Sequence, residues 1–332
     1  MKRSFGASLR CISCRRAGLT IRASEENDSE VREGAAACPD CGREFPIRNG
    51  ILDTLDPADE VIQSEIRGWI ELAGPLPEGL VSTMTALPYY PHGPWPHAAP
   101  DFFQLFEHVD FAGKHVVDIG AGRTWSTRFV KTIGRAEEVV ALDVLQTRFL
   151  GLETAEVFFR EDGIHFERIA GDLHDVPLVD GWADVVVSCA SVHHSSSLEK
   201  LFREAWRLLK PGGIFTFVSE PSKKASVEAT RPENAETEHG INEHIYAFGE
   251  YMAALRGVGF RPSQLSPRSV CYRLLYPDPE FLSGLPPVLA GLVKTSRGRR
   301  LFSWLAGGRL TGPILYRFAS LPLSVVARKP AT

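Results

Sequence analysis

Residues 116–126 read VVDIGAGRTWS. Three apolar residues surround Asp118, and Gly120 and Gly122 follow with one residue between them. The apolar run predicts a buried strand, the glycines a tight turn at its carboxyl end, and the polar residues after them the start of a helix. In an open parallel sheet, ligands bind beyond the carboxyl ends of the strands, so this turn is a candidate binding site. A dinucleotide fingerprint would place a third glycine three residues after Gly122, where Trp125 stands instead.

The chain around this turn alternates strand patterns with helix patterns. Continuous apolar runs predict buried strands at 114–120, 138–144, 166–172, 183–191, 213–221 and 322–330. Amphipathic patterns predict helices at 126–134, 153–162, 197–210 and 247–260. Such alternation is typical of the α/β class, so we expect a doubly wound, Rossmann-like parallel sheet in a domain over residues 111–332.

The first 55 residues read as a separate small module. Residues 23–37 are acidic and nearly devoid of large apolar side chains, which predicts a solvated loop. The dipeptide Asn49-Gly50, flanked by alternating apolar residues, predicts a hairpin that closes the module. We therefore place a domain boundary near residue 55.

Two further segments lie outside the alternating pattern. Residues 56–110 begin with a helix pattern at 56–74, and five prolines within 87–103 then argue against a continuous helix or a central strand, so we expect a lid segment. Residues 275–320 form an apolar insertion before the last strand. We expect a buried helical pair there, with an oligomer face or a membrane-surface helix as the alternatives.

Four of the six cysteines form two CxxC pairs, Cys11/Cys14 and Cys38/Cys41. Four thiolates from two such pairs close a tetrahedral zinc site and leave no open position for catalysis. A disulfide pair or a redox CxxC is the alternative, but no strand–helix context follows either pair. Because so small a module buries little apolar surface, we expect structural Zn²⁺ to supply most of its folding energy.

The bulk composition excludes several classes of protein. The chain has 332 residues, of which 44% are hydrophobic and 23% charged, with a formal net charge of −4. A negative balance supplies no global field that would attract nucleic acid. No stretch reaches the ~20 apolar residues that span a bilayer. We therefore expect a cytoplasmic protein with reduced cysteines.

Several motifs together resemble the class I S-adenosylmethionine-dependent methyltransferases of the type 11-like group. VVDIGAG resembles the first motif of that family, ALD (141–143) the second and GDLHDVP (171–177) the third. DVVVSCASVHH followed by LFREAWRLLKPGG resembles its fourth strand and the helix after it, and LSVVARK its last strand. Thr124 stands where the family often has a third glycine. Separately, CPDCGREFPIRNGIL resembles the zinc ribbon of methyltransferase activator subunits.

The resemblance implies S-adenosyl-L-methionine as the cofactor. The glycine turn would admit its amino-acid part against bare backbone, Asp143 would take the ribose diol, and Asp172 with Leu173 would flank the adenine. The implied cofactor-binding residues are Asp118, Gly120, Ala121, Gly122, Asp143, Asp172, Leu173, Ser188, Cys189 and Ala190.

The acceptor side is less defined by the sequence. His193 and His194 follow the fourth strand, where the acceptor lies in the family, and either could serve as a base for a hydroxyl acceptor. Glu220 ends the fifth strand and is a further catalytic candidate. A structural role in the cofactor pocket is the alternative for the histidines. Candidate acceptor-binding residues are Tyr89, Tyr90, His239, Glu243 and His244, with His92, Trp95, Glu238 and Asn242 nearby, although packing or helix capping would also explain them.

We expect O-methylation of a small-molecule biosynthetic intermediate, such as a sugar or a polyketide. An RNA methyltransferase is one alternative, against which the acidic balance argues. A non-catalytic scaffold with the methyltransferase fold is the other, against which the intact Asp118, Gly120, Gly122 and Asp143 argue. The expected partners are the small acceptor and a second copy of the chain in a homodimer.

Overall fold

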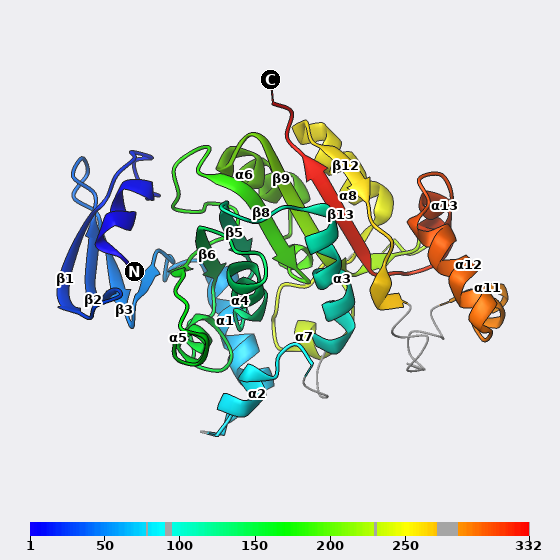
Figure 1. Cartoon of the computed structure of the whole chain (residues 1–332), viewed down its shortest axis with the longest axis horizontal. Coiled ribbons are helices and arrows are strands. Elements are labelled where there is room, and N and C mark those ends of the chain that lie inside the picture. The colour runs from blue at the N-terminus through cyan, green and yellow to red at the C-terminus, as the bar shows by residue number, and fades with distance from the viewer. Residues whose placement is uncertain (78, 90–94, 229–230, 271–284, 332) are drawn as a thin grey trace.

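The computed structural model describes residues 1–77, 79–89, 95–228, 231–270 and 285–331. Its centre is one eleven-stranded sheet in the order β1-β2-β3-β4-β7-β6-β5-β8-β9-β13-β12 (Figure 1). The five predicted strands at its middle are confirmed and run parallel. They are β5 (His115–Ile119), β6 (Glu138–Asp143), β7 (Glu167–Ala170), β8 (Ala183–Cys189) and β9 (Leu209–Glu220).

Helices cover both faces of this parallel part, as a doubly wound sheet requires. Successive strand residues point to opposite faces, so Val116 packs in one core with the helices α3–α5, whereas Val117 packs in the other with α6 and α8. These helices are α3 (Trp95–His108), α4 (Trp125–Thr132), α5 (Ala155–Asp162), α6 (Leu198–Leu208) and α8 (Phe248–Val258). Burial on both faces explains why the strands read as continuous apolar runs.

The predicted last strand is confirmed, but its direction differs from the expected parallel sheet. Strand β13 (Leu323–Arg328) pairs antiparallel with β9, and β12 (Arg261–Gln264), which the sequence did not reveal, pairs antiparallel with β13. Leu323, the first residue of β13, lies opposite Glu220, the last residue of β9. The chain therefore re-enters the sheet at the carboxyl end of β9 and runs back along it.

The prediction of a solvated loop at residues 23–37 is wrong. Strands β1 (Thr20–Glu26) and β2 (Val31–Ala37) form a hairpin there, and the predicted second hairpin follows as β3 (Glu44–Arg48) and β4 (Ile51–Asp53). Small side chains at 34–37 let β2 lie between β1 and β3. Strand β4 also pairs in parallel with β7, so the N-terminal strands continue the central sheet.

Residues 56–110, where the sequence predicts a lid segment, contain more helix than expected. Helix α1 (Glu60–Ala73) confirms the pattern at 56–74, and the short α2 (Val81–Thr85) follows. The expectation that the prolines prevent a continuous helix is wrong for α3, which begins at Trp95 and contains Pro96 and Pro100. Pro96 lies in the first turn, where a backbone N–H needs no helical partner. The buried Phe102 and Leu105 hold the rest of α3 on the sheet and outweigh the bond lost at Pro100.

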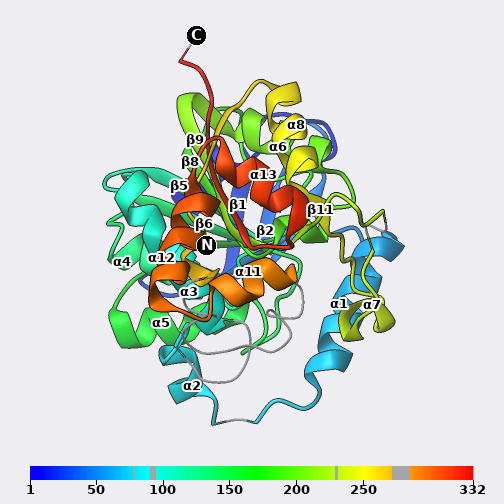
Figure 2. The same ribbon diagram turned by 90° about the vertical axis from the view of Figure 1, so that its right-hand side faces the viewer.

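The described part of the insertion before β13, residues 285–320, forms three helices instead of a buried pair. They are α11 (Pro287–Leu292), α12 (Ser296–Gly307) and α13 (Thr311–Phe318). Figure 2 shows them together at the end of the molecule that faces the viewer. Residues 275–284 of the insertion lie outside the described residues. None of the helices in the described ranges has the length and apolar character to cross a membrane.

Candidate functional site

The glycine turn after β5 opens the site. Gly120 and Gly122 have φ values of +69° and +49°, in the left-handed region that favours glycine. A Cβ on Gly120 would lie 2.3 Å from the Oγ of Ser191, whereas a Cβ on Gly122 would meet no atom within 4 Å. The turn is therefore packed against the protein at Gly120 and open at Gly122, where a ligand can approach the bare backbone.

Asp118, near the end of β5, joins the strand to the helix that follows the turn. Its Oδ2 accepts hydrogen bonds from the hydroxyls of Ser126 (2.7 Å) and Thr127 (2.6 Å) in the first turn of α4. Burial raises the pKa of Asp118 to about 6, against the lowering effect of the two hydroxyls. Because the carboxylate is fully buried, the structure gives Asp118 a role in positioning the turn and α4.

Asp143 joins the turn to the end of β6. Its Oδ2 accepts from the N–H of Gly122 and its Oδ1 from the N–H of Leu145, both at 2.8 Å. Burial raises the pKa of the Asp143 carboxyl. A cavity of about 610 Å³ lies between the end of α1 and the segment after β6; it is lined by Ile70, Gly74, Leu76, Pro77 and residues 147–150.

The ends of β7 and β8 complete this side of the site. Asp172 is half-buried, and its Oδ1 accepts from the Nδ1 of His174 at 3.0 Å. The Nε2 of His174 lies 2.7 Å from the Oγ of Ser195, so the loop after β7 is tied to the turn after β8. Ser188 is buried and hydrogen-bonds Ser191 at 2.6 Å. The remaining cofactor candidates line the same ends: Ala121 and Cys189 are buried, and Leu173 and Ala190 are partly exposed.

Glu220 and His193 form a buried ion pair at the ends of β9 and β8. The Oε2 of Glu220 lies 2.7 Å from the Nδ1 of His193, and the Nε2 of His193 lies 3.3 Å from Glu243. Glu220 also accepts from the backbone N–H groups of Ser191, Val192 and His193. Burial alone would lower the pKa of His193, but Glu220 and Glu243 together raise it to about 10. His193 is therefore already protonated at neutral pH and does not suit the role of a base.

His194 has the opposite character, although it is the next residue. Its Nδ1 lies 3.1 Å from the carbonyl oxygen of Asn242, which places the proton on that nitrogen. Burial and the neighbouring His193 charge lower the pKa of His194 to about 4. The ring is thus neutral, and its Nε2 has no hydrogen-bond partner among the described residues. About 14% of the side chain is exposed, and of the two histidines only His194 has an unprotonated ring nitrogen.

Helix α1 contributes residues to the site that sequence reasoning missed. Glu65 lies 3.3 Å from the Nδ1 of His194, and Trp69 packs against the His194 ring at 5.8 Å between centroids. Burial, with the Asp143 charge, raises the pKa of Glu65 to about 8. A Cβ on Gly68 would lie 2.4 Å from the carbonyl oxygen of His239, so glycine lets α1 approach this loop. The sequence predicted the helix but contained no signal for where it packs.

The structure brings only some of the predicted acceptor-binding residues to the site. Glu243 and His244 lie at the site: Glu243 is buried beside His193, and the backbone N–H of His244 donates to the carbonyl oxygen of His193. His239 belongs to the same loop, but its ring donates to the carbonyl oxygen of Ala235. Tyr89 is 67% exposed and stacks on Phe103. Tyr90 and His92 lie outside the described residues.

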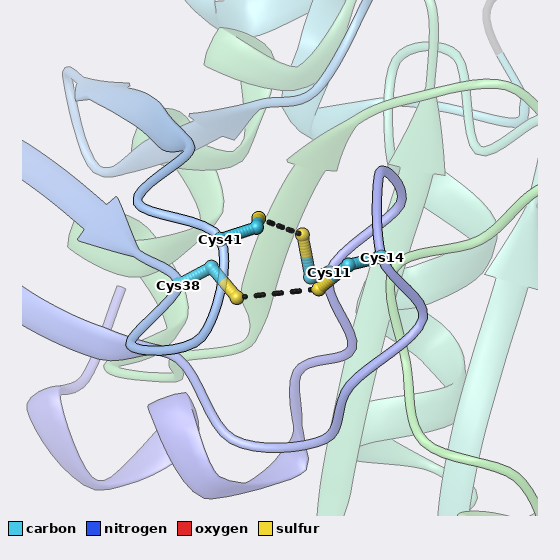
Figure 3. Close-up of side chains that lie close together, drawn as sticks. All are labelled: Cys11, Cys14, Cys38 and Cys41. Carbon is cyan, nitrogen blue, oxygen red and sulfur yellow. Dashed lines mark hydrogen bonds between the residues drawn. The ribbon is translucent and has the colours of Figure 1, made fainter.

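The four N-terminal cysteines converge (Figure 3). Cys14 and Cys38 have their sulfurs 3.5 Å apart, and Cys11 and Cys41 have theirs 3.7 Å apart. None of the four forms a disulfide. Four thiolates at ~2.3 Å around one tetrahedral zinc would be separated by about 3.8 Å. Hydrogen bonds from the backbone N–H groups of Cys41 and Asp40 lower the pKa of Cys38 to about 7, whereas burial and the neighbouring thiols raise the pKa of Cys14 to about 12.

Comparisons with known proteins agree with this geometry. Residues 117–217 match a family model described as "Methyltransferase domain". Over 108 residues the chain is 30% identical to the malonyl-[acyl-carrier protein] O-methyltransferase of Pectobacterium atrosepticum. The match covers 32% of this chain and 39% of that protein. Over 209 residues it is 27% identical to the phthiotriol/phenolphthiotriol dimycocerosates methyltransferase of Mycobacterium tuberculosis, with coverages of 61% and 68%.

Among solved structures, the geranyl diphosphate C-methyltransferase of Streptomyces coelicolor superposes with a TM-score of 0.52 at 17% identity. The match covers 83% of this chain and 99% of that one, and that crystal contains S-adenosyl-L-homocysteine. At this identity the likeness concerns the fold alone. The chain spans about two fifths of the length of the first curated relatives.

Proposed function

We propose that this chain, which carries a class I S-adenosylmethionine-dependent methyltransferase domain, methylates a hydroxyl oxygen of a small-molecule acceptor. The observation that carries the proposal is the neutral, partly exposed His194 at the end of β8, next to a cofactor site built on Gly122 and Asp143. A neutral imidazole can take the proton that a hydroxyl loses as its oxygen is methylated.

The residues present fit S-adenosyl-L-methionine. The open backbone at Gly122 would admit the amino-acid part, and the Asp143 carboxylate would accept hydrogen bonds from the ribose hydroxyls. Asp172 and Leu173 would flank the adenine, and Ser188 and Cys189 would line the methionine side. When bound, this cofactor supplies an electrophilic methyl group for in-line displacement.

The chain's own task is then to position the acceptor and to remove its proton. The carbonyl of Asn242 fixes the proton of His194 on Nδ1 and leaves the Nε2 lone pair unprotonated. The charge of His193 keeps His194 neutral, and Glu220 and Glu243 keep His193 charged. Because reactions of this kind depend on orientation, the rigid placement of the acceptor beside the base contributes to the rate.

Binding of S-adenosyl-L-homocysteine by isothermal titration calorimetry tests the cofactor assignment. We expect the wild type to bind it, and Asp143→Ala to bind at least about tenfold more weakly because a hydrogen bond to a charged group is worth about 1.5–3 kcal/mol. Asp110→Ala, in which the altered carboxylate is exposed and precedes β5 at the amino end of the parallel strands, is the matched control. A wild type without affinity would refute the assignment.

We further propose that Cys11, Cys14, Cys38 and Cys41 hold one structural Zn²⁺. The sulfur separations and the all-thiolate donor set support a closed tetrahedral site. Such a site has no open position for a substrate, so the metal would stabilise the N-terminal strands.

A further inference from the structure

The helices α11–α13 carry an unusual charge. Residues 285–320 contain six cations and no acidic residue, in a chain whose 41 acidic residues outnumber its 37 lysines and arginines. None of the six forms a salt bridge with any described residue. Five are exposed, whereas Arg299 is partly buried and donates to two backbone carbonyls. The exposed ones are Lys294, Arg297, Arg300, Arg309 and Arg317.

The same helices expose apolar side chains. Of the eleven large hydrophobic side chains that are exposed in the described part of the chain, six lie here. They are Val288, Leu301, Trp304, Leu310, Ile314 and Phe318. Trp304 is 70% exposed and Leu310 is 84% exposed. Leu310, Ile314 and Phe318 recur every four residues and therefore form one stripe along α13.

The helices that carry these exposed side chains are firmly packed on the domain through their other faces. Phe302, Ala306 and Tyr316 form the opposite faces of the helices and are buried in the domain. The hydroxyl of Tyr316 donates to the carbonyl oxygen of Pro322 at 2.7 Å, and its ring stacks on Phe248 at 5.0 Å. The helices are thus held to the domain by one face while the other remains in solvent.

A groove beside α12 combines both characters. It has a volume of about 730 Å³ and is lined by Ser266, Ser296, Arg299, Arg300, Ser303, Trp304, Gly307 and Gly308. Guanidinium and hydroxyl groups donate hydrogen bonds to phosphate oxygens, and an indole suits the boundary between headgroups and acyl chains. The groove therefore matches a phospholipid headgroup.

We propose that α11–α13 form a docking surface for anionic lipid bilayers. The apolar stripe enters the interfacial region, and the unpaired cations contact the lipid phosphates. A second copy of the chain fits this surface poorly, because a two-fold contact would bring like-charged patches together. An anionic bilayer satisfies both the charge and the exposed apolar side chains at one surface.

Vesicle co-sedimentation of the full chain tests the proposal. We expect binding to vesicles of phosphatidylglycerol mixed with phosphatidylcholine, little binding to phosphatidylcholine alone, and weakening as salt is raised. Arg297→Glu/Arg300→Glu should bind at least about tenfold more weakly, since each cation near an anionic surface contributes about 1 kcal/mol. Trp304→Ser/Phe318→Ser should also bind more weakly, because two apolar side chains that enter the interfacial region of the bilayer are removed.

Matched controls distinguish binding through α11–α13 from the effects of net charge and of exposed apolar side chains elsewhere on the surface. Arg135→Glu/Arg160→Glu makes the same charge change on exposed residues elsewhere, and Val61→Ser/Ile133→Ser removes exposed apolar groups elsewhere. Both should retain wild-type vesicle binding. Equal losses in controls and test variants, or a wild type that ignores anionic vesicles, would overturn the proposal. So would a dimer that Trp304→Ser/Phe318→Ser converts to monomer without any change in vesicle binding.

Discussion

The Nδ1 of His193 and the Oε2 of Glu220 lie 2.7 Å apart and join the turn after β8 to the end of β9. The same carboxylate accepts three backbone N–H groups of that turn. Glu220, expected from sequence to be catalytic, is fully buried. It is therefore a positioning residue, which holds the turn that carries His194.

Replacing Glu220 should destabilise the fold. Glu220→Ala leaves the buried His193 ring with Glu243 alone and three backbone N–H groups without an acceptor, and we expect the free energy of unfolding to fall by about 3–5 kcal/mol. Glu220→Gln keeps an acceptor and should lose less. Urea denaturation measures both variants, and an alanine variant as stable as the wild type would contradict this role.

The contribution of His193 should depend on pH. The folded protein raises its pKa from 6.5 to about 10, so the stabilisation is complete below about pH 6.5 and is lost as the pH rises towards 10. Thermal unfolding of the wild type and His193→Gln should therefore differ most near pH 6 and converge near pH 10. A difference that stays constant over this range would rule out a charged His193.

His194 should affect the chemistry more than the binding. We expect His194→Asn to lower kcat about 100-fold, as for the loss of a general base, and to leave the Kd for S-adenosyl-L-homocysteine within about twofold. His108→Asn, at the exposed end of α3, should keep wild-type kcat. Steady-state kinetics with an identified acceptor measures kcat for both variants. Equal losses of kcat in the two variants would argue against His194 as the base.

Loss of zinc should weaken the whole sheet, because β4 pairs with β7 and links the cysteine-bearing module to the central strands. Metal analysis of the purified protein should find about one zinc per chain. Cys38→Ser should lose the metal and unfold at a lower temperature in a single transition, whereas Cys189→Ala should keep its zinc. Two separate unfolding transitions would show that the module and the domain are energetically independent.

A buried ion pair strengthens the same junction. Arg168 on β7 is fully buried, and its Nη2 donates to Glu30, between β1 and β2, at 2.7 Å. Glu30→Gln should cost about 3–5 kcal/mol, because it removes the carboxylate that the buried guanidinium of Arg168 shares with Arg32 and His165 and leaves Arg168 with Glu156 as its remaining carboxylate. Arg168→Met should leave Glu30 with Arg32 and His165, and should cost less. Chemical denaturation of both variants tests this order.

The sequence alone determined the centre of the fold. Strands β5–β9 are buried on both faces, so their apolar runs and the helix periodicities between them could be recognised without tertiary information. The glycine turn, Asp143 and the two CxxC pairs could also be recognised, because each is defined by residue types at short, fixed spacings. The acidic strands β1 and β2 escaped prediction because the pairing of β1 with β2 and of β2 with β3, and not their own composition, stabilises them.

The tertiary structure alone decided the chemistry of the histidine pair. His193 and His194 are adjacent and identical in type, yet their pKa values are raised to about 10 and lowered to about 4. Glu220 from β9 and Glu243 from the loop after α7 (Ala235–Glu238) make one an imidazolium, and its charge together with burial keeps the other neutral. Partners that lie 27 and 50 residues away from His193 along the chain set this difference, and local sequence cannot specify which ring they reach.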